Sequence, residues 1–126
     1  MSRTFAALAA VTLLFASSAA SAQMLKTADT AKGKTFVDAK GMTLYIFDKD
    51  AGGKSACNGP CAENWPALMA ADDAKPTADM TIVVRDDGKK MWAYKGKPLY
   101  TFKKDMAAGE TNGDGFLNGA WHVAKP

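Results

Sequence analysis

The sequence contains one histidine, two cysteines and no block of like charges, and each scarcity argues against a class of function. A single histidine, His122, leaves no local Ser/His/Asp arrangement for hydrolysis and no set of histidines for catalytic zinc. The 16 basic and 13 acidic residues are interspersed along the chain. This pattern is not typical of a protein that binds nucleic acid or an anionic membrane. We therefore expect a non-catalytic protein that does not bind nucleic acid.

Long apolar runs are also scarce, and the one at the N-terminus reads FAALAAVTLLFA. It is too short to span a bilayer as a helix, which takes about 18 or more apolar residues. Arg3 precedes this run, and Ala20-Ser21-Ala22 follows it with small residues suited to cleavage. This arrangement predicts a signal peptide over residues 1–22, cleaved after Ala22. Because no cysteine stands at the cleavage site, we expect export to a bacterial periplasm without a lipid anchor.

The two cysteines, Cys57 and Cys61, stand in the sequence CNGPC. A cysteine pair this close in an exported chain favours a disulfide, which the Asn-Gly-Pro turn can accommodate. The loop is short, so we expect a local constraint that contributes roughly 2 kcal/mol. A redox pair would have Cys-x-x-Cys spacing, and covalent haem attachment would add a histidine. Neither pattern occurs in this chain.

A seven-residue sequence occurs twice with small differences, as LYIFDKD over residues 44–50 and LYTFKKD over residues 99–105. The similarity between the two copies extends to a preceding glycine and a following tryptophan, so the chain contains two copies of one unit. A supersecondary unit that occurs in tandem usually buries its apolar face against its twin. The repeated positions are Gly41/Gly96, Leu44/Leu99, Tyr45/Tyr100, Phe47/Phe102, Asp50/Asp105 and Trp65/Trp121.

Strand-forming residues lie on both sides of a Lys-Gly turn in each copy, TFV and TLYIF in the first, MWAY and PLYTF in the second. This pattern predicts two β-hairpins, with further strands over residues 80–86 and in AWHVA. A short helical turn is expected at Cys61–Trp65, ended by Pro66. The sequence therefore predicts one all-β domain over residues 35–126, a small sandwich or barrel. Its repeats span residues 35–68 and 91–126, joined by a connector and the strand, and residues 23–34 form an N-terminal arm.

The repeated motif has two interpretations. Tyr and Phe share one face of each predicted strand, and the Asp follows the strand where it can accept hydrogen bonds from a turn. The motif then supplies buried aromatic anchors and a turn-fixing acid. Alternatively, the two Tyr–Asp sets meet across a pseudo-twofold axis and form a ligand cleft. The candidate binding residues are Tyr45, Phe47, Asp50, Trp65, Tyr100, Phe102, Asp105 and Trp121.

The Tyr-x-Phe-x-x-Asp motif occurs twice, and it is followed by NGPCAENWP in the first copy and by GDGFLNGAWHVAKP in the second. This pattern resembles a family of bacterial secreted repeats. That family carries a Y-x-(F/W/Y)-x-x-D motif, and many of its members are predicted lipoproteins. The resemblance covers residues 35–126 and implies an exported tandem-repeat protein. It implies no catalytic residue. The missing lipid-acceptor cysteine distinguishes this chain from the lipoprotein members.

Two weak metal-binding patterns keep a second function open. Glu110, Asn112 and Asp114 stand at alternate positions before Gly115, as in the opening of a calcium loop, but the twelfth position is Trp121 rather than Glu. His122 together with scattered methionines could bind copper. We expect a non-catalytic exported repeat module without a cofactor, which binds an unknown protein or small-molecule ligand through a surface made by the two repeats. The alternative is a metal-handling protein that uses calcium or copper.

Overall fold

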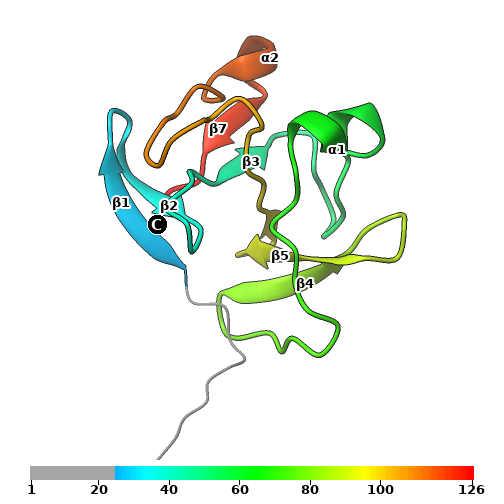
Figure 1. Cartoon of the computed structure of the whole chain (residues 1–126). Helices are drawn as coiled ribbons and strands as arrows, with labels where there is room; N and C mark the ends of the chain where they lie inside the picture. The colour runs from blue at the N-terminus through cyan, green and yellow to red at the C-terminus, as the bar shows by residue number, and fades with distance from the viewer. Residues whose placement is uncertain (1–24) are drawn as a thin grey trace, which may run out of the picture.

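The computed structural model describes residues 25–126, so the expected signal peptide lies outside the described residues. Figure 1 shows the β1–β2 hairpin beside β3 and β7, with the β4 and β5 strands below them. The elements are β1 (Lys26–Thr30), β2 (Gly33–Val37), β3 (Tyr45–Phe47), α1 (Pro60–Asn64), β4 (Met80–Val84), β5 (Lys90–Tyr94), β6 (Lys97–Pro98), α2 (Phe116–Gly119) and β7 (Trp121–Val123).

The strands form three small antiparallel sheets, which confirms the all-β prediction. The sheets are β1–β2, β3–β7 and β4–β5–β6, and they do not close into one barrel over residues 25–126. Helix α1 confirms the short helical turn expected before Pro66. No helix among the described residues has the length and apolarity needed to cross a membrane.

The segment expected as an N-terminal arm is structured from Lys26 onward. Strand β1 pairs with β2 along its whole length, from Lys26 opposite Val37 to Thr30 opposite Gly33. Polar composition concealed this strand because β1 lies at the surface, where Lys26, Thr27 and Asp29 are exposed. Strand β1 therefore precedes and pairs with β2 as β4 precedes and pairs with β5.

The two expected hairpins form around their Lys-Gly turns. In the second repeat, Lys95 and Gly96 both have positive φ angles of 49° and 84°, the conformation of a tight primed hairpin turn. In the first repeat a wider turn, in which the Asp38 carboxylate accepts hydrogen bonds from the backbone, brings Val37 opposite Thr43. The same turn residues thus close both hairpins with different loop lengths.

The end of the second repeat completes the sheet of the first. Strand β7 pairs with β3, so that Trp121 lies opposite Phe47. Beyond β7, the backbone N–H of Phe36 donates to the carbonyl of Ala124 at 2.9 Å, and the N–H of Ala124 donates to the carbonyl of Leu44 at 2.8 Å. Ala124 therefore lies between two strands of the other repeat.

The end of the first repeat in turn forms backbone hydrogen bonds with the second repeat. The N–H of Trp92 donates to the carbonyl of Leu68 at 2.8 Å, and the N–H of Leu68 donates to the carbonyl of Leu99 at 2.9 Å. On the axis that relates the repeats, Tyr45 and Tyr100 exchange both backbone hydrogen bonds, at 2.7 and 3.0 Å. The repeats are therefore interlocked, because β7 extends the sheet of the first repeat and residues 67–69 bridge to Tyr100 and Met91 of the second.

Alternation along β3 buries both of its faces, as the sequence predicted. Tyr45 and Phe47 belong to one apolar cluster, whereas Leu44 belongs to a second cluster against which Ile46 packs. Both clusters take members from both repeats, so neither repeat contains a complete core.

Separated halves of the chain should therefore lack fixed tertiary structure. An isolated first half, cut in the connector after Asp73, would expose several large aromatic side chains whose burial contributes about 1.5–3 kcal/mol each. The expected result is no near-ultraviolet circular dichroism from either half alone and a native-like spectrum after the halves are mixed. A single half with a cooperative unfolding transition would contradict the interlocked fold.

Candidate functional site

The two copies of the motif exchange partners. The hydroxyl of Tyr45 donates to Oδ2 of Asp105 at 2.6 Å, and the hydroxyl of Tyr100 donates to Oδ2 of Asp50 at 2.7 Å. Each tyrosine is thus paired with the aspartate of the other repeat, across the axis on which the two strands meet. A short hydrogen bond to a carboxylate is roughly twice as strong as one between neutral groups.

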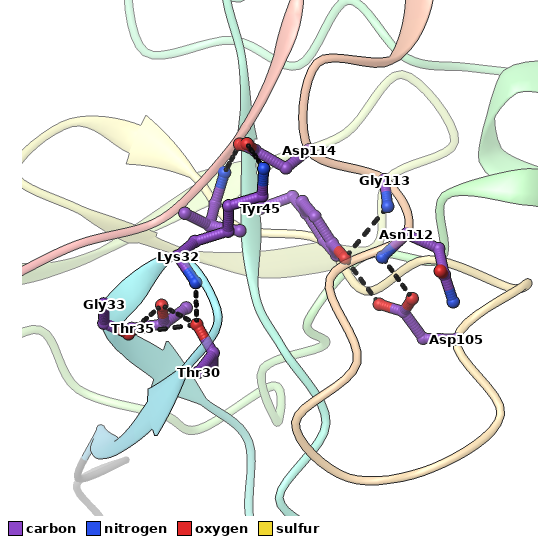
Figure 2. A network of polar contacts seen from close by, with 10 residues as sticks. Thr30, Lys32, Gly33, Thr35, Tyr45, Asp105, Asn112, Gly113 and Asp114 are labelled. Carbon is purple, nitrogen blue, oxygen red and sulfur yellow. Dashed lines mark hydrogen bonds and ion pairs between the residues drawn. The ribbon is translucent and has the colours of Figure 1, made fainter.

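The Tyr45–Asp105 pair is enclosed by the loop that precedes β7. Figure 2 shows the Tyr45 hydroxyl between Asp105 and the backbone of Gly113, whose N–H donates to it at 3.2 Å. The other carboxylate oxygen of Asp105 accepts the N–H of Asn112 at 3.0 Å. A Cβ at Gly113 would lie 2.5 Å from the Trp65 ring, so only glycine lets the loop approach this closely. Asp105 is 5% exposed and its oxygens have partners.

The Tyr100–Asp50 pair continues into a longer polar chain. The Tyr100 hydroxyl lies 2.6 Å from Oγ of Ser55, which accepts a hydrogen bond from Nη1 of Arg85 at 3.1 Å. Nη2 of Arg85 donates to the carbonyl of Cys57 at 2.7 Å. The second oxygen of Asp50 accepts the N–H of Ala56 at 2.6 Å. The two pairs therefore have the same centre but different surroundings.

Arg85 was not among the residues predicted from the sequence. Its side chain is 7% exposed, and no carboxylate of the described residues lies within ion-pair distance of its guanidinium. A charged residue at the end of the apolar run MTIVV is the signal that could have indicated it. A buried guanidinium is stable only when its donors have partners. Here it fixes Ser55 beside Tyr100.

Burial shifts the pKa values of three of these groups. Desolvation, reinforced by the hydrogen bond to Asp105, raises the pKa of Tyr45 far above its ordinary value. Desolvation also raises the pKa of Tyr100, to which its bond to Asp50 contributes. The pKa of Asp50 is raised by burial, against the opposing effect of the Ala56 and Tyr100 hydrogen bonds. Burial therefore favours the neutral form of each group.

Four aromatic rings form a continuous stack that alternates between the repeats. The order is Phe47, Trp121, Trp65, Phe102, with centroid separations of 4.1, 3.7 and 4.1 Å. The two central indoles are parallel within 2°. The motif tyrosines lie edge-on to this stack, Tyr45 against Trp65 at 5.3 Å and Tyr100 against Trp121 at 5.1 Å. The stack is therefore the shared centre of both motif copies.

The structure brings all eight predicted motif residues together and buries most of them. The six aromatic side chains are at most 8% exposed, so their faces contact one another rather than solvent. Asp50 is half-buried and reaches the surface at the wall of a depression. The surface near the motif is therefore formed by its neighbours.

A groove between the two repeats provides that surface. It consists of two depressions of about 120 and 230 Å³ that share Ile46 and Lys97. Phe47, Asp48, Asp50 and Gly96 complete the smaller depression, and Tyr94, Lys95, Ala124, Lys125 and Pro126 complete the larger one. We call these two depressions the repeat groove. The second Lys-Gly turn is the one feature of the sequence that indicates this groove, because Lys95 and the following Lys97 line the larger depression.

Among the candidate metal ligands, Nδ2 of Asn112 donates to Oε1 of Glu110 at 3.3 Å, and the others are bonded to further groups of the protein. His122 Nε2 lies 2.8 Å from Oδ2 of Asp48. Glu110 accepts backbone N–H groups of its own turn, and Asp114 accepts the N–H of Val123 and pairs with Lys32 at 3.5 Å, as Figure 2 shows for Asp114. No group of three or more His, Cys, Asp or Glu side chains within residues 25–126 is arranged to hold a metal ion.

Cys57 and Cys61 form the expected disulfide, with their Cα atoms 5.2 Å apart. It closes the turn that leads into α1. The Cys57 carbonyl belongs to this turn and Ser55 precedes it by two residues, and both accept hydrogen bonds from Arg85. The disulfide therefore supports the polar chain beside Tyr100.

The geometry defines a β protein built from two interlocked repeats. A family described as a secreted repeat of unknown function matches residues 26–69 and 81–125, more than half of the chain. The chain belongs to this family, which confirms the resemblance seen in the repeated motif. Both matches reach back to β1 and β4, the strands that open each repeat. No curated protein and no solved structure gave a match.

Alkaline titration should show that Tyr45 and Tyr100 do not ionise in the folded protein. Because their folded pKa values are raised, their contribution to stability is complete below about pH 10 and is lost as the pH rises further. The expected ultraviolet titration shows two of the three tyrosines ionising together with unfolding. Ionisation of all three while the near-ultraviolet circular dichroism stays native would contradict the buried pairs.

Proposed function

We propose that the protein is an exported, non-catalytic binding module that takes up a small organic anion with an apolar body in the repeat groove. One observation supports this most strongly, namely that the groove is built by both repeats while the motif side chains form the core beneath it. The interlocked core fixes the two walls relative to each other, so the site exists only in the assembled pair. Such preorganisation lowers the entropic cost of binding.

Charge selects the class of ligand. Lys95, Lys97 and Lys125 are exposed around the larger depression, and none of them makes an ion pair among residues 25–126. The two carboxylates at the opposite end already have partners, Asp48 with His122 and Asp50 with Tyr100. Among the described residues, the larger depression is therefore lined by three unpaired lysine side chains and by no carboxylate side chain.

The floor of the larger depression suits an apolar body. Ile46, Tyr94 and Ala124 contribute it, and Tyr94 is fixed by an edge contact with Phe36 at 4.7 Å. Lys95 Nζ lies 5.3 Å from the centre of the Tyr94 ring, so a cation is already held above this floor. The volume of about 230 Å³ is smaller than a typical drug-sized pocket, which favours a small ligand or one side chain of a partner.

We further propose that the site works in a bacterial periplasm. The family description calls the repeat secreted, and the predicted signal peptide over residues 1–22 supports the same route. The intact mass of the protein from a periplasmic extract tests this, because cleavage after Ala22 gives a chain that starts at Gln23. A mass that includes residues 1–22 would contradict it.

Binding of anilinonaphthalene sulfonate, measured by its fluorescence, tests the groove. Changing Lys95, Lys97 and Lys125 together to alanine should weaken binding at least about tenfold at about 0.1 M salt, since each charge near an anion contributes about 1 kcal/mol. The uncharged analogue phenyl-naphthylamine should bind the parent protein more weakly and show no such dependence.

A matched triple variant controls for net charge. Lys40, Lys54 and Lys103 are exposed and do not line the groove, and Lys40 is the first-repeat counterpart of Lys95. Changing these three to alanine removes the same charge and should leave the affinity within about twofold, because charges beyond a Debye length are largely screened. Equal losses in both triple variants would contradict an anion site in the groove.

A further inference from the structure

The aromatic stack and its hydrogen-bonded tyrosines have the parts needed for one-electron chemistry, which ligand binding in the groove does not use. Trp65 and Trp121 face each other at 3.7 Å and 2°, a geometry in which two rings share a positive charge. Each indole is also touched edge-on by a tyrosine, at 5.3 and 5.1 Å between centroids. An electron can therefore pass between neighbouring rings over contact distance.

We propose that the aromatic stack and its two tyrosines can be oxidised by one electron. The electron passes to a one-electron oxidant at the protein surface, and the oxidised product is a neutral tyrosyl radical on Tyr45 or Tyr100. The proposal concerns the core rather than the groove, so it stands apart from the proposed ligand binding. It assigns the repeated Tyr-x-Phe-x-x-Asp motif a chemical role in addition to its packing.

The aspartates make the oxidation possible because a tyrosine that loses an electron must also lose its phenol proton. Oδ2 of Asp105 lies 2.6 Å from the Tyr45 hydroxyl, and Oδ2 of Asp50 lies 2.7 Å from the Tyr100 hydroxyl. A base within hydrogen-bond distance can accept the proton in the same step. Without such a base, a phenol this deeply buried would have no acceptor for its proton.

The electrons and protons balance in two transfers. The oxidant gains one electron from the Trp65–Trp121 pair, and a tyrosine then returns an electron to that pair. Its proton moves from the phenol oxygen to the aspartate Oδ2. The products are the reduced oxidant, a neutral tyrosyl radical and a neutral carboxylic acid, and a one-electron reductant such as ascorbate reverses both transfers.

Both ends of the stack give an oxidant access. At one end Phe47, stacked on Trp121, lines the smaller depression of the repeat groove. At the other end Phe116 is 44% exposed and lies 5.4 Å from Phe102 and 5.9 Å from Trp65. Either contact places an oxidant one ring away from a central indole.

Flash oxidation by photogenerated ruthenium(III) tris-bipyridine, followed by electron paramagnetic resonance, tests the proposal on the full folded protein. The chain has three tyrosines, and Tyr94 has no carboxylate partner among the described residues. In Tyr94→Phe, the neutral tyrosyl signal should persist at the parent yield, because Tyr45 and Tyr100 are the tyrosines that remain. Loss of that signal in Tyr94→Phe, or tryptophan radicals alone in the parent protein, would overturn the proposal.

A second variant locates the radical. Tyr45→Phe with Tyr100→Phe should abolish the neutral tyrosyl signal of the buried centre and leave tryptophan oxidation intact. A tyrosyl signal of parent yield in this variant would come from Tyr94 and would also overturn the proposal. Because Tyr94 is half-buried at the surface and its hydroxyl makes no hydrogen bond within residues 25–126, Tyr94→Phe keeps the test decisive even if the double variant fails to fold.

Discussion

The structure depends on one constraint, that each repeat finds its partners in the other repeat. The tyrosine hydroxyl of one copy donates to the aspartate of its twin, the phenylalanine stacks on the twin's tryptophan, and the final segment pairs with the twin's backbone. A single copy would expose its aromatic residues and deprive its aspartate of the tyrosine donor, and a hydrogen bond to a charged group contributes about 1.5–3 kcal/mol. The repeat therefore occurs twice in one chain because one copy cannot complete its own core.

Similar backbones around the axis have acquired different surroundings. On one side the Tyr45–Asp105 pair is closed by the backbone of Asn112 and Gly113. On the other side a disulfide-bonded turn brings Ser55 to Tyr100, and Arg85 fixes the serine. This asymmetry matters for function, because it leaves one aspartate enclosed and the other half-buried at the repeat groove.

The sequence was sufficient for the parts of the fold that are local. Lys-Gly turns, alternating aromatic residues and the close cysteine pair predicted the hairpins, the two-sided burial of β3 and the disulfide. The sequence left open which tyrosine pairs with which aspartate. Both copies contain the same tyrosine hydroxyl and aspartate carboxylate, so spacing alone does not distinguish pairing within a repeat from pairing between repeats. Strand β1 was missed since its exposed residues lack apolar periodicity, and the lysines of the groove are gathered only by folding.

The exchange of partners is also the claim on which both proposals rest, since it builds the groove walls and places the tyrosines beside the indoles. A double-mutant cycle measures it most directly, with the free energy of unfolding obtained from urea titrations. For Tyr45→Phe combined with Asp105→Asn, which lie in different repeats, the account predicts a coupling energy of about 1–3 kcal/mol. For Tyr45→Phe with Asp50→Asn, which lie in the same repeat, it predicts less than about 0.5 kcal/mol. The reverse order of these two coupling energies would contradict the exchanged architecture.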